Sequence, residues 1–299
     1  MQTVIPIRYI NPVFRPPSEA QSLILPLTNG CSWNKCTYCE MYTAPQKKFA
    51  VRDEQETLNS IRKIGVQFSN QVQRIFIGDG DAMALSTRRL MTVLGSIKEH
   101  LPAVRRVSSY CLPRNVRTKS VQELTELREA GLSLAYVGAE SGDDEVLRKV
   151  TKGETFDSTR DALEKLGEAG ITRSVMLLNG LGGRALSRQH AENSARLANA
   201  TQPEFLASLV VSFPQGEQRF LQEFPEWEAL NQAELFLEIE HLLQRLDLRR
   251  TVFRSDHASN WLALKGTLGA EKARLLREVR HAIERPTSAP LRQDWQRGL

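Results

Sequence analysis

The stretch LILPLTNGCSWNKCTYCEMY, residues 23–42, joins a short apolar run to three cysteines within nine residues. The apolar run has the length of a buried β-strand and ends in a polar turn. Cys31, Cys36 and Cys39 follow that turn directly. In α/β proteins with parallel strands, reactive groups gather on the loops after the strands, so this loop is the first candidate for a functional site.

Outward from this stretch, β-rich runs alternate with helical stretches as far as residue 213, which is the pattern of a parallel sheet built from βα units. Six such units in roughly 190 residues predict an α/β fold, a partial (β/α)6 TIM-like barrel that stays open. The six expected strands are residues 23–27, 73–77, 104–110, 133–138, 173–178 and 205–211.

Helical signals fall between these strands. Residues 53–64 place apolar side chains at helical spacing. Ser120 and Glu123 form a capping box before the next apolar repeat. A third helix, residues 157–169, ends at Gly170.

After residue 213 the β signal stops, and long helical patterns cover residues 226–246 and 270–283. We therefore expect three parts, which are an N-terminal segment 1–21, the barrel 22–215 and a helical C-terminal extension 216–299 on the substrate side. The last residues, 285–299, have the composition of a frayed or disordered end.

Composition limits the class of protein. The chain has 299 residues, of which 41% are hydrophobic and 25% charged, which suffices for a globular core. Its most apolar stretch, 205–211, is far shorter than the roughly 20 residues that span a bilayer. Residues 1–17 lack the apolar core of a signal peptide. We expect a cytoplasmic protein without a membrane partner.

The net charge of +5 is concentrated at the C-terminal end. Residues 248–299 carry 11 basic and 5 acidic side chains, a surplus of +6. A basic tail can bind a polyanion, but a solvated helix face is the more common reason for such a pattern. We therefore expect a small-molecule substrate in preference to nucleic acid.

Three thiolates this close in sequence predict one metal centre. Structural zinc is almost always four-coordinate, so a zinc site here needs a distant fourth ligand, for which Cys111 is available. A cubane iron–sulfur cluster takes four cysteines, so three leave one iron open for a substrate or cofactor. The second alternative implies catalysis.

Cys36-Thr-Tyr38-Cys39, followed by Glu-Met-Tyr, resembles the radical S-adenosylmethionine (SAM) superfamily, and within it the branch of coproporphyrinogen oxidase and elongator-type enzymes. The resemblance covers roughly residues 23–213 and suggests a stand-alone member. It implies a [4Fe-4S] cluster on Cys31, Cys36 and Cys39, with SAM chelated at the open iron. The first cysteine spacing, four residues in place of the usual three, departs from the pattern.

The resemblance also implies SAM-binding residues at the strand ends. The run Gly78-Asp79-Gly80-Asp81 resembles the motif that holds the SAM amino group. Glu140, in Gly-Ala-Glu-Ser-Gly, would bind ribose hydroxyls or the SAM head. The remaining expected contacts are Ser109 and Asn179, which line the adenosyl pocket, and Tyr38, which packs against adenine.

The reaction that the resemblance implies is reductive cleavage of SAM. One electron from the cluster yields methionine and a 5′-deoxyadenosyl radical, which abstracts hydrogen from the substrate. The electron would come from a reductase or from a flavodoxin- or ferredoxin-type donor.

Two side chains are candidates for catalysis on the substrate. His257 lies in segment 251–267, which we expect to fold back over the barrel mouth. The alternative is a polar helix start with Ser255 or Asp256 as N-cap. Cys111, at the end of the third strand, would donate a hydrogen atom, or would be an ordinary buried cysteine.

A different class of function stays open on the residues alone. The basic C-terminal segment also suits an RNA-binding or sensory metalloprotein whose cysteine loop holds a structural zinc or cluster. Consumption of SAM separates this alternative from the enzyme.

Overall fold

The computed structural model describes residues 5–297 and divides them into two compact units. Each unit is assembled from separate parts of the sequence, because the chain passes between the units several times. Unit 1 holds the chain up to Asn34, Met41–Val137 and Lys165–Thr172, and unit 2 holds Lys35–Glu40, Gly138–Glu164 and the chain from Arg173 on. The expected boundaries at residues 21 and 215 remain predictions.

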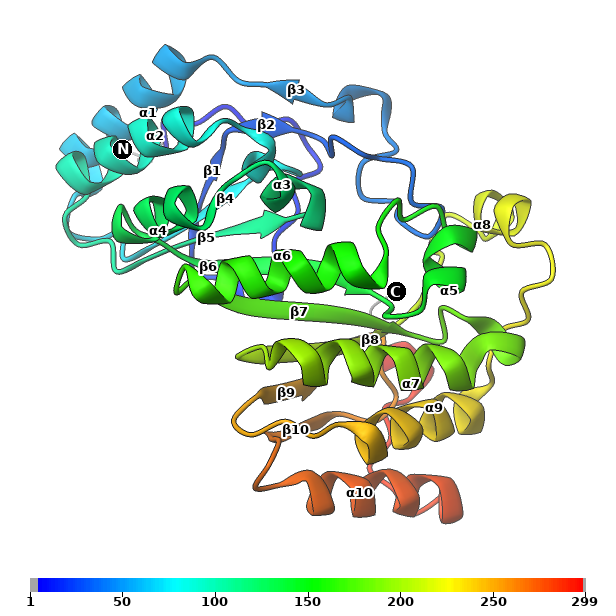
Figure 1. Ribbon diagram of the computed structural model, residues 1–299. Helices are drawn as coiled ribbons and strands as arrows, with labels where there is room; N and C mark the ends of the chain where they lie inside the picture. Colours follow the sequence, from blue (N-terminus) through cyan, green and yellow to red (C-terminus); the bar gives the residue numbers. More distant parts are fainter. Residues whose placement is uncertain (1–4, 298–299) are drawn as a thin grey trace. The chain divides into compact units, whose positions relative to one another are not determined.

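Unit 1 is built on four parallel strands with helices between them (Figure 1). Its strand order is β1-β4-β5-β6, and neighbouring strands pair in parallel. Its elements are β1 (Leu23–Pro26), β2 (Thr28–Asn29), β3 (Ala50–Val51), α1 (Glu54–Phe68), β4 (Arg74–Gly78), α2 (Thr87–His100), β5 (Arg106–Cys111), α3 (Pro113–Arg117), α4 (Val121–Glu129) and β6 (Leu132–Glu140), with short 3-10 helices at Pro17–Glu19, Pro45–Lys47 and Ala82–Ala84. The last three residues of β6 belong to unit 2.

The helices of unit 1 form where the sequence supplies both caps and an apolar stripe. Asp53 caps α1, and Ser120 with Glu123 forms the predicted capping box of α4. Ile61 of α1 and Leu124 of α4 are fully buried, as the 3.6-residue repeat requires. The helical expectations for this part of the chain are confirmed.

Unit 2 contains the second set of strands and the longer helices. Strands β7, β8 and β9 run parallel, and β10 pairs antiparallel with β9. The elements are α5 (Asp144–Lys149), α6 (Phe156–Glu168, whose last turn lies in unit 1), β7 (Thr172–Asn179), α7 (Gly183–Thr201), β8 (Phe205–Val210), α8 (Gln218–Glu223), α9 (Gln232–Arg245), β9 (Val252–Ser255), β10 (Leu264–Thr267), α10 (Lys272–Glu284) and a 3-10 helix at Asp294–Gln296. Figure 1 shows α7, α9 and α10 side by side along these strands.

The α/β class and the six parallel strands β1 and β4 to β8 are confirmed. The expectation that strands end after residue 213 is wrong, because β9 extends the parallel set beyond β8. The alternative of a helix start at Ser255 or Asp256 is wrong for the same reason, since Ser255 ends β9. β9 has only four residues, one of them the exposed Arg254, and pairing with β8 makes it a regular strand. Among residues 5–297, no helix is long and apolar enough to cross a membrane.

The C-terminal tail is ordered by an arginine, so the expected fraying of residues 285–299 is wrong for the described part, which ends at residue 297. The Arg292 guanidinium donates to the carbonyl oxygens of Asp256, His257 and Asn260 at 2.5–2.9 Å. Arg297 stacks on Trp261, with its guanidinium carbon 3.2 Å from the ring centroid. A guanidinium satisfies several carbonyls at once, which a scan for apolar periodicity does not register.

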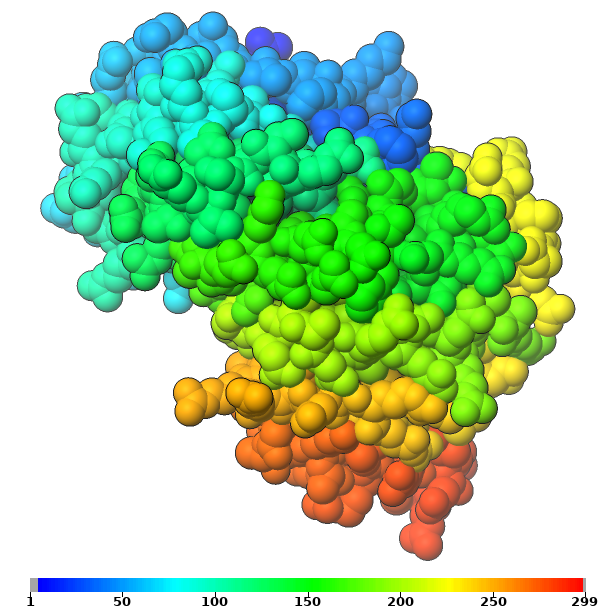
Figure 2. Space-filling model, viewed as in Figure 1, coloured from blue at the N-terminus to red at the C-terminus, as the bar shows by residue number. Residues whose placement is uncertain are grey.

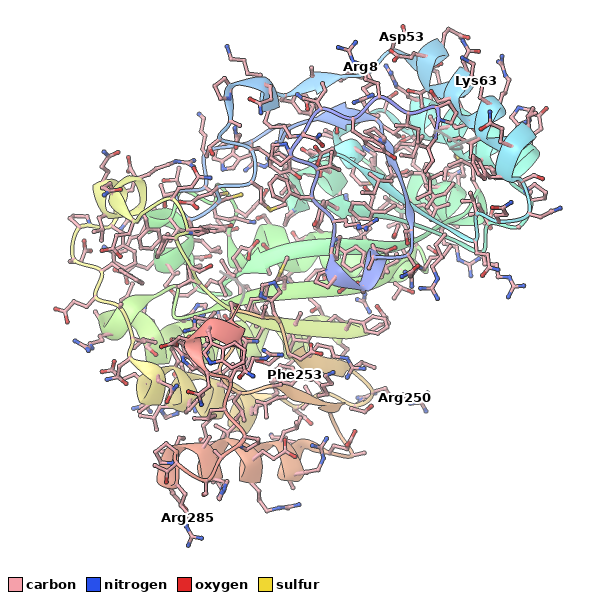
Figure 3. The ribbon with its side chains drawn as sticks, turned by 180° about the vertical axis from the view of Figure 1, so that it is seen from behind. Arg8, Asp53, Lys63, Arg250, Phe253 and Arg285 are labelled. Atoms are coloured by element: carbon pink, nitrogen blue, oxygen red, sulfur yellow. The ribbon has the colours of Figure 1, made fainter. Side chains whose placement is uncertain are left out.

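We expect Arg292→Ala to release this tail. Losing three hydrogen bonds from a charged donor should make cleavage of residues 285–297 by proteinase K roughly tenfold faster. The matched control is Arg285→Ala, since Arg285 is exposed and points away from the strands at the end of α10 (Figure 3). Equal cleavage rates for the two variants would contradict the role given to Arg292.

Candidate functional site

The second half of the cysteine loop lies in unit 2 and is shaped by a tight turn. The backbone N–H of Cys39 donates to the carbonyl of Cys36 at 3.2 Å, which is the turn that a two-residue gap allows. Thr37 anchors the turn, because its N–H and its hydroxyl both donate to the carbonyl of Val150, just after α5. Cys36 and Cys39 are therefore held on one short, fixed arc.

Cys31 lies in unit 1, in the segment that packs against the turn after β4. Gly80 has φ +93°, and a Cβ on it would lie 2.1 Å from the carbonyl oxygen of Gly30. Only glycine permits this approach. Convergence of Cys31 with Cys36 and Cys39 stays a prediction. Within the part of the chain that the structure describes, no group of three or more His, Cys, Asp or Glu is placed to hold a metal ion.

A buried lysine joins the cysteine loop to the end of β6. The Lys152 ammonium lies 3.2 Å from the Glu140 carboxylate and 3.2 Å from the Tyr38 hydroxyl. Burial alone would lower the pKa of Lys152, but its charged neighbours, Glu140 foremost, more than offset this and raise that pKa. Gly138 leaves room for the carboxylate, since a Cβ there would lie 2.1 Å from Glu140 Oε1. The three polar groups form one charged cluster inside unit 2.

The turn after β4 brings its two aspartates into different environments. Asp79 is satisfied within the protein, because it forms a buried ion pair with Lys47 and accepts a hydrogen bond from the Tyr42 hydroxyl at 3.3 Å. Asp81 accepts from Ser32 and, at 3.4 Å, from Asn115, both through Oδ2.

The other carboxylate oxygen of Asp81, Oδ1, takes no part in these hydrogen bonds. Oδ1 is buried and has no hydrogen-bond partner among the described residues. Burial raises the pKa of this carboxyl, and its hydrogen bonds to Ser32 and Asn115 act in the opposite direction. A buried acceptor without a partner is uncommon in native proteins and indicates a missing donor.

The strand ends β5 and β7 supply the two other expected pocket residues. Ser109 is buried, and its hydroxyl contacts the carbonyl oxygens of Ile77 at 3.1 Å and Tyr110 at 2.9 Å. Asn179 donates through Nδ2 to the carbonyl of Leu235 in α9 at 3.3 Å. Its Oδ1 is a second buried acceptor with no partner among the described residues.

A buried polar network holds the ends of β6 and β7 in unit 2. Glu238 of α9 accepts from the Gly180 N–H at 2.6 Å and from the Ser187 hydroxyl at 2.5 Å. His190 of α7 lies 3.8 Å from Glu238 and is hydrogen-bonded through Nδ1 to Ser141 at 2.8 Å. Burial raises the pKa of Glu238, and His190 opposes the rise. A cavity of about 10 Å³, enough for one water, lies beside Asn179.

The two substrate-side candidates have structural partners. Cys111 ends β5, is buried, and donates to the carbonyl of Leu112 at 3.5 Å. His257 is half-buried and contacts Ser259 through Nδ1 at 3.0 Å. Burial, followed by the nearby Arg292, lowers the pKa of His257. Their catalytic roles remain predictions.

Asn260, a neighbour of His257, extends the sheet edge. It accepts from the Val210 N–H at 2.9 Å and donates to the carbonyl of Ser208 at 2.8 Å, so it continues the hydrogen bonding of β8. Segment 251–267 is therefore a strand pair with a polar turn between its strands, β9 and β10.

The donor set fits an iron–sulfur cluster and SAM. The chain supplies three cysteines on one loop, a buried cation at Lys152 and an unpartnered buried acceptor at Asp81. Asn179 Oδ1 lies beside the cavity for one water, so a water can satisfy it. SAM carries a carboxylate, an ammonium, an adenine amino group and ribose hydroxyls, which need one cation and several acceptors. The cluster, the SAM carboxylate and the SAM ammonium thus each have a counterpart among these residues.

Sequence reasoning missed Lys152, Glu238 and His190. Nothing in the local pattern separates Lys152 from the other lysines, since only the tertiary fold buries it. Glu238 left a weak signal in the sequence, because it lies three residues after Leu235 and four before Leu242, on the apolar face of the helix. A charged residue at a core position of a helix is uncommon and marks a buried network.

Comparison with known proteins identifies the family. Residues 25–198 match the Radical SAM superfamily. A curated relative is the heme chaperone HemW of Bacillus subtilis (strain 168), which is 27% identical over 184 residues, or 59% of this chain and 47% of that protein. The chain thus spans about half the length of this relative.

Solved structures share the fold. Coproporphyrinogen III oxidase (HemN) from Escherichia coli, a radical SAM enzyme, aligns with a TM-score of 0.55 and 14% identity, covering 75% of this chain and 50% of that one. The methyltransferase TsrM from Kitasatospora setae, solved with cobalamin and a [4Fe-4S] cluster, aligns with a TM-score of 0.51 and 18% identity, covering 62% and 36%. The likeness to HemN confirms the partial-barrel fold.

We expect Glu238→Ala to lower the free energy of unfolding by about 3 kcal/mol, because it leaves the Gly180 N–H and His190 without their buried partner. Glu238→Gln, which keeps an acceptor for that N–H, should cost roughly half as much. Urea denaturation measures both values. The control is Glu240→Ala on the same helix, whose ion pair with Arg280 reaches the surface and should contribute at most about 1 kcal/mol. Equal losses for Glu238→Ala and Glu240→Ala would contradict the importance of the network.

Proposed function

Because the chain belongs to the radical SAM superfamily, we propose that it binds a [4Fe-4S] cluster through Cys31, Cys36 and Cys39 and cleaves SAM reductively to begin radical chemistry on a small molecule. The observation that carries the proposal is the buried Lys152 ammonium, held between Glu140 and Tyr38 beside the cysteine arc. Buried ionisable groups with specific partners cluster at functional sites, which is why this ammonium supports the proposal.

When bound, the cluster and SAM supply a single-electron cleavage that yields methionine and a 5′-deoxyadenosyl radical able to take hydrogen from a substrate. The task of the chain is to hold these groups. Cys31, Cys36 and Cys39 would hold three irons of a four-iron cluster, and the fourth iron would have no protein ligand. The open corner is where SAM is chelated in this proposal.

The remaining residues bind SAM by complementary charge. Lys152 supplies the cation for its carboxylate, and Asp81 Oδ1 supplies an acceptor for its ammonium. Glu140 would accept from ribose hydroxyls, Asn179 would line the adenosyl pocket, and Tyr38 would pack against adenine. Glu140 and Asn179 end strands, Asp81 follows one, Tyr38 lies on the cysteine loop, and Lys152 follows α5.

Radical SAM enzymes need an electron donor. A reductase, or a flavodoxin- or ferredoxin-type protein, is the donor we propose here. A reduced cluster also needs a reducing compartment, so the proposal places the protein in the cytoplasm.

The substrate is proposed to be a small molecule. The basic C-terminal region argues weakly for nucleic acid, because part of its charge is neutralised within the protein. Arg274 pairs with Glu271 and Glu278, and Arg280 pairs with Glu240. These arginines serve a solvated helix surface, as the sequence favoured.

The test is anaerobic reconstitution with iron and sulfide, followed by dithionite and SAM, with products read by mass spectrometry. The wild-type protein should release 5′-deoxyadenosine, and Cys31→Ala, Cys36→Ala and Cys39→Ala should each abolish it. The control is Cys111→Ser, which alters the fourth cysteine of the chain and should keep SAM cleavage. A protein that binds zinc and leaves SAM intact would contradict the proposal and favour the structural-metal alternative.

A further inference from the structure

Residues 213–227, which follow β8 and contain α8, lie against the cysteine arc of unit 2. We infer that this segment, the aromatic cap, is a closing lid over Cys36 and Cys39, and that Arg219 is the positioning residue that latches it. The inference rests on the proposed function, because it concerns two of the proposed cluster ligands. It is carried by contacts that involve no cofactor.

Two hydrogen bonds tie the cap to the cysteine loop. The Arg219 guanidinium donates to the carbonyl oxygen of Cys39 at 2.8 Å. The backbone N–H of Gln215 donates to the Glu40 carboxylate at 3.0 Å. Both acceptors belong to the last two residues of the loop in unit 2. The cap is therefore fastened at the cysteine end of the arc.

Aromatic packing forms the body of the cap. Four rings contact one another with centroids 4.8–5.8 Å apart, and they belong to Phe213, Phe220, Phe224 and Trp227. They form a core cluster with Val146, Val150 and Leu181, and Tyr38 packs against it. Tyr38 stands between the two cysteines in sequence, so this apolar cluster reaches the loop itself. Such packing excludes water from the surface it covers.

The cap also closes against α5. Lys149 pairs with Glu226, and its ammonium lies 4.9 Å from the centroid of the Phe224 ring. Figure 2 shows the yellow atoms of the cap packed beside the green atoms of this region. The cap thus spans from the end of the cysteine loop to the helix whose end anchors Thr37.

The cap has the features of a movable element. Its helix, α8, has only six residues, which is too short to be stable without its tertiary contacts. The segment before it, residues 214–218, is exposed. Local opening is expected at this exposed stretch, whereas the rings of Phe220 and Phe224 are fully buried and stay with the core cluster. Cys36 and Cys39 are half-buried, and release of Arg219 and of residues 214–218 would expose them further while the aromatic cluster and the strands stay folded.

The first experiment needs no metal. Reduced apoprotein is treated with N-ethylmaleimide, and alkylation is followed by peptide mass spectrometry. Trypsin cuts after Lys35, so Cys31 falls on one peptide and Cys36 with Cys39 on the next. Loss of a hydrogen bond from a charged donor makes the open cap roughly tenfold more populated, so Arg219→Ala should label the second peptide roughly tenfold faster.

Two variants show whether the effect belongs to the latch. Arg219→Lys keeps a cationic donor and should label at nearly the wild-type rate. Arg188→Ala removes an exposed arginine of the same unit, paired with Glu192, and should leave the rate unchanged. Equal rates for Arg219→Ala and wild type, or no rescue by lysine, would overturn the inference.

A second readout uses the reconstituted protein. A water-soluble ferrous chelator should extract iron from Arg219→Ala several-fold faster than from wild type, and Arg219→Lys should again restore the slow rate. Faster labelling of the apoprotein together with equal iron release would overturn the shielding role. A wild-type protein that takes up no cluster would overturn the proposed function, whereas the labelling result on the apoprotein would still decide whether the cap exists.

Discussion

The site in unit 2 depends on the two contacts that the buried Lys152 ammonium makes. Taking an ammonium out of water costs several kcal/mol unless partners compensate for the loss. Here the partners are the Glu140 carboxylate at the end of β6 and the Tyr38 hydroxyl on the cysteine loop. The same charge therefore joins the loop to the strand end, and in the proposed function it supplies the cation for the SAM carboxylate.

Helices α7 and α9, in the C-terminal half of the chain, stabilise the strand ends next to these contacts. Glu238 of α9 fixes Gly180 after β7, and His190 of α7 fixes Ser141 beside Glu140. The aromatic cap covers the other side of the loop through Arg219. These contacts stabilise the strand ends and the cysteine arc, and the substrate-side role of residues 216–299 stays a prediction.

The six parallel strands could be predicted because each is an apolar run between turn residues. β6 is an example, with residues 133–138 expected and Leu132–Glu140 observed. The capping box at Ser120 could be predicted from the sequence equally well. Strand β10, in contrast, has four residues, one of them Gly266, and becomes a strand only because β9 pairs with it.

For the site, residue types could be predicted, and their partners could not. The cysteines and Glu140 stand out by spacing and by position after a strand. Whether Asp79 or Asp81 has an unpartnered oxygen depends on Lys47, which is more than 30 residues away in sequence and is fully buried. Burial of a charge is a property of the whole unit, so a local pattern cannot reveal it.

The central claim is that SAM binds at an open iron of a three-cysteine cluster beside Lys152. Electron paramagnetic resonance of the reconstituted, dithionite-reduced protein tests this most directly, because a ligand at the open iron alters the cluster signal. The account predicts that SAM changes the wild-type signal, and that Lys152→Ala needs a higher SAM concentration for the same change. A wild-type cluster signal that is identical with and without saturating SAM would contradict it.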